Sequence, residues 1–156
     1  METSYHENYI KQLERLLKVV IKSQRKYSEA SDNIESPELK NLFNTRVTER
    51  QQIAVELQEH ITKLGGHSDE LSYEGNPHHF NSTKSGTSSK HDQSVLESIR
   101  NSEQEALDAY DDTMQGTILE NLELKTLMSS HRLSISEAFG DLDSRYFSMF
   151  KSSEPY

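Results

Sequence analysis

Residues 36–66, SPELKNLFNTRVTERQQIAVELQEHITKLGG, decide the fold of this chain. Ser36 can cap a helix, and Pro37 suits the first helical position, because the N–H that proline lacks has no partner there. Gly65 and Gly66 supply a left-handed stop. Between these ends, apolar side chains recur at the spacing of a helix and not of a strand: Leu39, Leu42, Phe43, Val47, Ile53, Ala54, Leu57, Ile61 and Leu64. The stretch therefore predicts a helix over 37–64, roughly 40 Å long, and its apolar stripe needs partners of similar length.

The same periodicity continues on both sides of this helix. It predicts three further helices, at about 4–32, 92–115 and 118–145. Residues 65–91 lack the period and are rich in Ser, Thr, Gly and Asn, which predicts a long loop. The short turn before Ser36 forces the first two helices into an antiparallel hairpin, and Gly116 predicts a tight turn between the last two. We therefore predict a single all-α domain over 1–156, an antiparallel four-helix bundle of two helical hairpins joined by a long crossover loop.

Composition excludes several functional classes. The chain has 156 residues and a formal net charge of −9, and this negative field disfavours nucleic acid and anionic lipid as partners. It contains no cysteine, which excludes disulfides, thiolate metal sites and cysteine nucleophiles. No apolar run approaches the length of a membrane span, and the N-terminal residues lack a signal-peptide core. We expect a soluble cytoplasmic protein that binds neither nucleic acid nor membrane.

Several motifs resemble a known family. The S-P-E-L-K-x-L-F start at Ser36, the T-E-R-Q-Q-I-A-x-E-L run from Thr48 and the L-G-G ending at Gly66 are similar to those of a bacterial ferritin-like family of unknown function. The stretch from Ser102 to Tyr110 adds to the similarity, so that the resemblance covers about residues 9–66 and 94–142. It implies the ferritin-like four-helix bundle of the wider superfamily and implies no activity.

A di-iron centre of the ferritin-like type takes a Glu from each of two helices and a Glu-x-x-His motif from each of the other two. No Glu-x-x-His occurs in this chain. The residue three positions before His131 is Met128, and the residue three positions after Glu49 is Gln52. Since the ligand set is incomplete, we do not expect a ferroxidase centre of the ordinary type.

Five polar side chains nevertheless fall on inward stripes near mid-length: Gln24, Arg46, Glu49, Glu103 and His131. In one interpretation, Glu49, Glu103 and His131 are the ligands of a reduced site for iron or another divalent metal, because carboxylates and imidazoles suit such ions. In the other, they form a buried polar layer in which Arg46 neutralises Glu49 or Glu103 and His131 hydrogen-bonds to a carboxylate. The permanent charge of Arg46 opposes a metal ion and favours this second interpretation.

Other polar groups are less specific. His67, His78, His79 and His91 fall in the predicted loop, where nothing fixes their geometry, and Glu56 and His60 are interpreted as a surface pair on one helix. The sequence contains no nucleophile elbow, phosphate loop or dinucleotide motif.

Two functions follow as hypotheses. The first is a non-enzymatic structural or interaction protein with no cofactor, and the alternative is a metal-binding or oxidase-type protein with the reduced site. A homodimer is also expected, because aromatic residues near the termini need covering: Tyr5, Tyr9, Phe147 and Phe150.

Overall fold

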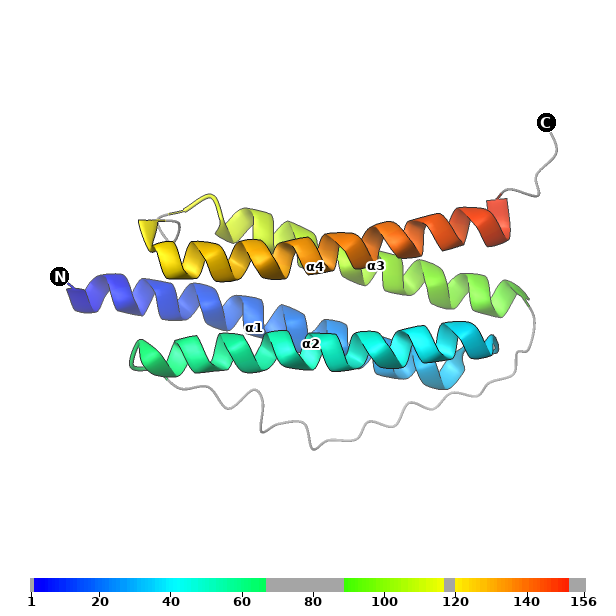
Figure 1. The fold of residues 1–156 in the computed structure, drawn as a ribbon, viewed down its shortest axis with the longest axis horizontal. Helices are drawn as coiled ribbons and strands as arrows, with labels where there is room; N and C mark the ends of the chain where they lie inside the picture. The colour runs from blue at the N-terminus through cyan, green and yellow to red at the C-terminus, as the bar shows by residue number, and fades with distance from the viewer. Residues whose placement is uncertain (1, 67–88, 117–119, 152–156) are drawn as a thin grey trace.

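The computed structural model describes the backbone of residues 2–66, 89–116 and 120–151 (Figure 1). The described elements are α1 (Glu2–Asn33), α2 (Pro37–Lys63), α3 (Ser89–Thr113), α4 (Leu122–Tyr146) and a short π-helix, η3 (Phe147–Lys151). α1 and α2 form one antiparallel hairpin, and α3 and α4 form the other. α2 ends and α3 begins at opposite ends of the bundle, as a crossover connection requires (Figure 1). The predicted all-α four-helix bundle is thus confirmed.

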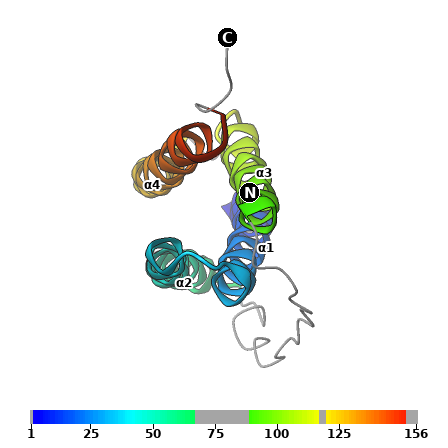
Figure 2. The ribbon, with the colours of Figure 1, turned by 90° about the vertical axis from the view of Figure 1, so that its right-hand side faces the viewer.

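When the bundle is seen from its end, the four helices form an open arc in the order α2, α1, α3 and α4 (Figure 2). Backbone contacts join α2 to α1, α1 to α3 and α3 to α4. α2 and α4 stand at the two ends of this arc, and long polar side chains connect them. Within the described residues, no helix has an apolar stretch long enough to cross a membrane.

Local chemistry fixes both ends of α2. The Ser36 hydroxyl accepts a hydrogen bond from the Leu39 N–H at 3.2 Å, and Pro37 occupies the first turn. At the other end Gly65 adopts φ +100°, a left-handed conformation that favours glycine. The Gly66 N–H then donates to the carbonyl of Ile61 at 2.9 Å, so the end of the helix closes as the sequence predicts.

Two other helices begin away from their predicted starts. α4 begins at Leu122 and not at 118, because Asn121 is its N-cap and accepts a hydrogen bond from the Leu124 N–H at 3.0 Å. α3 begins at Ser89, before the predicted start at 92, so His91 lies in this helix and not in a loop. His91 Nε2 lies 2.8 Å from the carbonyl oxygen of Asn33, and this contact ties the start of α3 to the end of α1.

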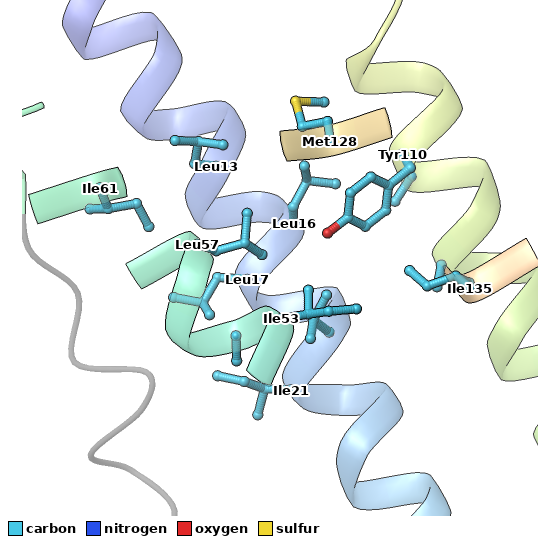
Figure 3. Packing of buried hydrophobic residues seen from close by; sticks show 14 of the residues in the cluster. Leu13, Leu16, Leu17, Ile21, Ile53, Leu57, Ile61, Tyr110, Met128 and Ile135 are labelled. Atoms are coloured by element: carbon cyan, nitrogen blue, oxygen red, sulfur yellow. The ribbon is translucent and has the colours of Figure 1, made fainter. Parts of the chain in front are cut away.

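The core consists of two apolar clusters separated along the bundle. The first lies toward the N-terminal half of α1 and includes Leu13, Leu16, Leu17, Ile53, Leu57, Ile61, Tyr110, Met128 and Ile135 (Figure 3). The second includes Tyr27, Ile34, Leu39, Phe43, Leu96, Ile99, Leu142 and Tyr146. In α1, α2 and α3, buried polar residues lie between the residues that belong to the two clusters. They are Ser23 in α1, Arg50 in α2, and Ser102 and Glu103 in α3, and we call them the polar layer. The interior of the bundle is therefore polar near its middle and apolar on either side.

Candidate functional site

The centre of the polar layer is an ion pair between α2 and α3. The side chains of Arg50 and Glu103 are both 0% exposed, and Arg50 Nη2 donates a hydrogen bond to Glu103 Oε2. The hydroxyl of Tyr27, from α1, donates to the same carboxylate oxygen. The guanidinium carbon of Arg50 also lies 5.5 Å from the centroid of the Tyr27 ring. Three helices thus meet at one buried carboxylate.

The charges of this ion pair balance each other. A buried carboxylate is tolerated when it is paired, and the guanidinium of Arg50 is the cation beside Glu103. Burial raises the pKa of Tyr27 well above its usual range, and the neighbouring Glu103 charge raises it further, so the phenol stays protonated and donates. Within the described residues, Glu103 Oε1, Ser23 Oγ and two nitrogens of Arg50 are buried without a hydrogen-bond partner. The charges of Arg50 and Glu103 therefore balance, although these other polar atoms of the layer form no hydrogen bond within the described residues.

Arg46 lies one helical turn before Arg50 and has a different partner. Its Nη1 lies 2.9 Å from Glu49 Oε1, and its Nη2 lies 3.6 Å from Asp141 Oδ2 in α4. The Glu49 side chain is 39% exposed, so it lies at the surface of the bundle and not in its interior. Of the two partners predicted for Arg46, the structure selects Glu49, and the cation on Glu103 is Arg50.

His131 is buried in a second polar contact, between α2, α3 and α4. It is 3% exposed, and its Nε2 lies 2.7 Å from Glu56 Oε1 while its Nδ1 lies 3.1 Å from the Tyr110 hydroxyl. A neutral imidazole satisfies both contacts, with Nε2–H donating to Glu56 and Nδ1 accepting from Tyr110. Burial lowers the pKa of His131, and Glu56 opposes this in part; the net direction is downward. The hydrogen bond from His131 in turn lowers the pKa of Glu56.

The structure does not bring Glu49, Glu103 and His131 together. Each has its own partners: Arg46 for Glu49, Arg50 for Glu103 and Glu56 for His131. Over residues 2–66, 89–116 and 120–151, no group of three or more His, Cys, Asp or Glu side chains is arranged to hold a metal ion. These donors do not fit an ordinary di-iron centre, which needs bridging carboxylates and histidines around one point. Metal binding by the three residues stays a prediction.

Sequence reasoning did not find Arg50 or Glu56. Arg50 falls on the same heptad position as Phe43 and Leu57, which are both fully buried, and this spacing was the available indication. The sequence predicts that Glu56 and His60 form a surface pair on one helix. In the structure both reach α4: Glu56 contacts His131, and His60 Nε2 lies 3.2 Å from Glu123 Oε2.

Ion pairs join α2 to α4 from one end to the other, and we call this line of contacts the α2–α4 seam. Arg145 pairs with Glu38 at 3.1 Å near the start of α2, and Lys63 pairs with Glu123 at 2.8 Å near its end. The contacts of Arg46 with Asp141 and of Glu56 with His131 lie between them. The two hairpins are therefore held together on this side by polar side chains.

Several solved structures share this fold. A ferritin-like, diiron-carboxylate protein from Bacillus anthracis is 20% identical, with a TM-score of 0.70 over 90% of this chain and 96% of that chain. A two-domain protein from Anabaena variabilis, with DJ-1/ThiJ/PfpI-like and ferritin-like domains, is 14% identical, with a TM-score of 0.71 over 97% of this chain and 40% of that chain. A DPS protein from Vibrio cholerae is 19% identical, with a TM-score of 0.55 over 91% of each chain. At these identities the likeness shows the fold alone.

The sequence itself matches one family. No curated protein matches it significantly. Residues 8–116 match the domain of unknown function DUF2383, and this match covers more than half of the chain. The chain therefore belongs to the DUF2383 family, and its fold is the ferritin-like four-helix bundle.

Proposed function

We propose that this protein is a non-enzymatic ferritin-like bundle with a structural or interaction role, in which an ion pair takes the place of a di-iron centre. The observation that carries the proposal is the pairing of Arg50 with Glu103, both of them 0% exposed. A metal ion at Glu103 would have to displace a permanent cation from a buried carboxylate. Leaving one partner of a buried pair uncompensated costs about 3–5 kcal/mol, so the pair opposes metal entry.

The other interior polar groups support the same role. Tyr27 donates to Glu103, and the two ring nitrogens of His131 already contact Glu56 and Tyr110. Groups that catalyse acid–base or redox steps need contact with a substrate or an open ligand position. Here these side chains bind one another across helices, which favours a role in fixing how the helices pack.

The alternative is a metal-binding or oxidase-type protein, and one observation favours it. Glu103 Oε1 is buried without a hydrogen-bond partner in the described part of the chain. A carboxylate oxygen of this kind is a suitable donor for iron or another divalent ion. In the proposed function Glu103 pairs with Arg50, whereas in the alternative it binds a metal ion, so one experiment separates the two.

Elemental analysis of untagged protein, purified without chelator, tests the proposal. We expect the wild-type protein and the Glu103→Ala variant to contain no stoichiometric metal, and Glu103→Ala to unfold at lower denaturant concentration because Arg50 loses its partner. Glu105→Ala is the matched control, because it removes an exposed carboxylate of the same helix that pairs with Lys22. Stoichiometric iron, manganese or zinc in the wild type that is lost in Glu103→Ala and retained in Glu105→Ala would overturn the proposal.

A further inference from the structure

The two hairpins of the bundle correspond to each other residue by residue. We call α1 and α2 the N-terminal hairpin, and α3 and α4 the C-terminal hairpin (Figure 1). A residue of α1 corresponds to the residue 83 positions later in α3, as Lys22 does to Glu105. A residue of α2 corresponds to the residue 85 positions later in α4, so Ser36 corresponds to Asn121, and these two are the N-caps of their helices. Buried counterparts in α2 and α4 include Leu39 and Leu124, Phe43 and Met128, Leu57 and Leu142, and Ile61 and Tyr146.

The α2–α4 seam shows that an approximate two-fold axis relates the hairpins. Glu38 pairs with Arg145 at 3.1 Å. Their counterparts, Glu123 and His60, lie 3.2 Å from each other. The remaining contacts of Arg46 with Asp141 and of Glu56 with His131 are counterparts of each other in the same way. A two-fold interface has this reciprocity, in which residue i contacts j and j contacts i.

The ion pair of the polar layer breaks this symmetry. The counterpart of Arg50 is Ile135, and the counterpart of Glu103 is Val20. All four residues are 0% exposed, and Val20 and Ile135 belong to the same apolar cluster. The position that a charged pair occupies between α2 and α3 is therefore occupied by two apolar side chains between α4 and α1. Two hairpins of this kind can pack at this position without any charge.

The charges matter when one considers which hairpins pair. Because the hairpins are alike, each one could also pack against the same hairpin of a second copy. Two N-terminal hairpins would place Arg50 against Val20 of the other copy, and two C-terminal hairpins would place Glu103 against Ile135. Either arrangement leaves buried charges without their partners, which is strongly destabilising. Arg50 meets Glu103 only when an N-terminal hairpin packs against a C-terminal hairpin.

A second ion pair, on the two-fold axis, acts in the same direction. Lys22 and Glu105 are counterparts of each other, and Lys22 Nζ lies 3.1 Å from Glu105 Oε1. Like hairpins would bring Lys22 against Lys22, or Glu105 against Glu105. These side chains are 58% and 62% exposed, so their contribution is small. The seam does not discriminate, because an acidic side chain would still meet Arg or His in each of its contacts.

From these observations we infer that Arg50 and Glu103 determine which hairpins pair. The pair favours packing of the N-terminal hairpin against the C-terminal hairpin, and it excludes packing of like hairpins from two copies. A polar residue inside a helical interface can select the partner in this way, at a cost in stability. The inference rests on the proposed function in one respect, since Glu103 must pair with Arg50 and not with a metal ion. Stoichiometric metal bound by Glu103 would overturn the proposed function, whereas the experiment below tests the pairing alone.

Pairing of hairpins is distinct from association of two complete bundles. The homodimer that the sequence predicts stays a prediction, because it depends on the aromatic residues near the termini. Of these, Tyr9 is buried and Phe147 is exposed, while the side chains of Tyr5 and Phe150 lie outside the described part.

A single introduced cysteine can report the pairing of like hairpins, because the chain has no cysteine of its own. Lys22→Cys is the reporter, since residue 22 lies on the axis and its two copies meet when two N-terminal hairpins pack together. It is placed in the wild-type chain and in the variant Arg50→Ile/Glu103→Val, which gives each position the residue of its counterpart. Lys40→Cys, at an exposed position near the start of α2, is the control for random collision.

Each chain is unfolded, refolded at high protein concentration and mildly oxidised, and the disulfide-linked fraction is measured. We expect Lys22→Cys to cross-link several-fold more in the Arg50→Ile/Glu103→Val chain than in the chain with the ion pair, and Lys40→Cys to cross-link equally in both. Equal cross-linking of Lys22→Cys in the two chains would overturn the inference. Loss of cooperative unfolding in the double variant would also overturn it, because Val20 and Ile135 indicate that two apolar side chains fit this position.

Discussion

At the scale of single residues, the interior depends on how the charges of Arg50 and Glu103 are balanced. We predict that Arg50→Met destabilises the protein by about 3–5 kcal/mol, because it leaves Glu103 buried without its cation. The double variant Arg50→Met/Glu103→Leu should recover most of this loss, since replacing both partners by apolar groups is often neutral. Denaturant unfolding of the single and double variants checks this. A double variant no more stable than Arg50→Met would show that the pair is not the source of the loss.

His131 should make stability depend on pH. Because burial lowers its pKa in the folded protein, the unfolded chain binds the proton first as the pH falls. Stability is therefore complete above about pH 6.5, the usual pKa of histidine, and decreases below it. Glu56, whose pKa is also lowered, adds a further loss at more acidic pH. We predict that His131→Gln flattens the dependence between about pH 7 and 5, which thermal unfolding at several pH values measures. Equal slopes in wild type and variant would contradict this.

A buried polar residue could be predicted where the apolar period of its own helix places it on the inward side. The periodicity of a single helix places Glu103 and His131 on inward stripes, and both are buried. Arg50 also falls on an apolar stripe, but arginine is rarely buried unless paired, and its partner comes from another helix. The choice between Arg46 and Arg50 as the cation on Glu103 therefore depends on how α2 and α3 pack, which no pattern within α2 specifies.

At the scale of elements, α2 was predicted well because its ends are set by local chemistry. We predict that Gly65→Ala destabilises the protein by about 1–2 kcal/mol, because the residue has φ +100°. Gly65→Asn should cost less, since Asn tolerates the left-handed region better. Chemical denaturation of both variants measures the difference. An Asn variant that is no better than Ala would mean that backbone conformation is not the cause.

The start of α4 shows where local reasoning failed. Apolar residues before Leu122 continue the helical spacing, so the predicted start was placed too early. α4 begins directly after Asn121, because the side chain of Asn121 accepts a hydrogen bond from the Leu124 N–H and its own backbone is extended.

At the scale of the whole molecule, the α2–α4 seam joins two hairpins whose backbones meet through α1 and α3, and which the buried pair of Arg50 and Glu103 links between α2 and α3. Asp141 is central to it, because its Oδ2 contacts both Arg46, at 3.6 Å, and Arg145, at 3.0 Å. We predict that Asp141→Asn destabilises the protein by about 1 kcal/mol, and that added salt reduces the difference from wild type. Lys22→Ala, which breaks an exposed pair with Glu105, should change stability by less than about 0.5 kcal/mol. Equal effects of the two substitutions in denaturant unfolding would show that the seam has no special role.

The bundle and its hairpins could be predicted because helix length, turn length and loop length limit the topology. The seam could not be predicted, since its pairs join residues that are far apart in sequence and depend on which faces meet. Glu56 illustrates this: nothing near it in sequence indicates a contact with His131. The same holds for the outer face of α4, where exposure is known only once the neighbours of the helix are placed.

Tyr27 and Tyr110 give the chain a built-in optical reporter. The chain has no tryptophan, and burial raises the pKa of both phenols above their usual range. In the folded protein they should stay un-ionised at alkaline pH values at which exposed tyrosines already absorb as tyrosinate. The tyrosinate absorbance of an alkaline titration should therefore rise in two stages, and the second stage should coincide with unfolding, so that the interior can be followed without any attached dye.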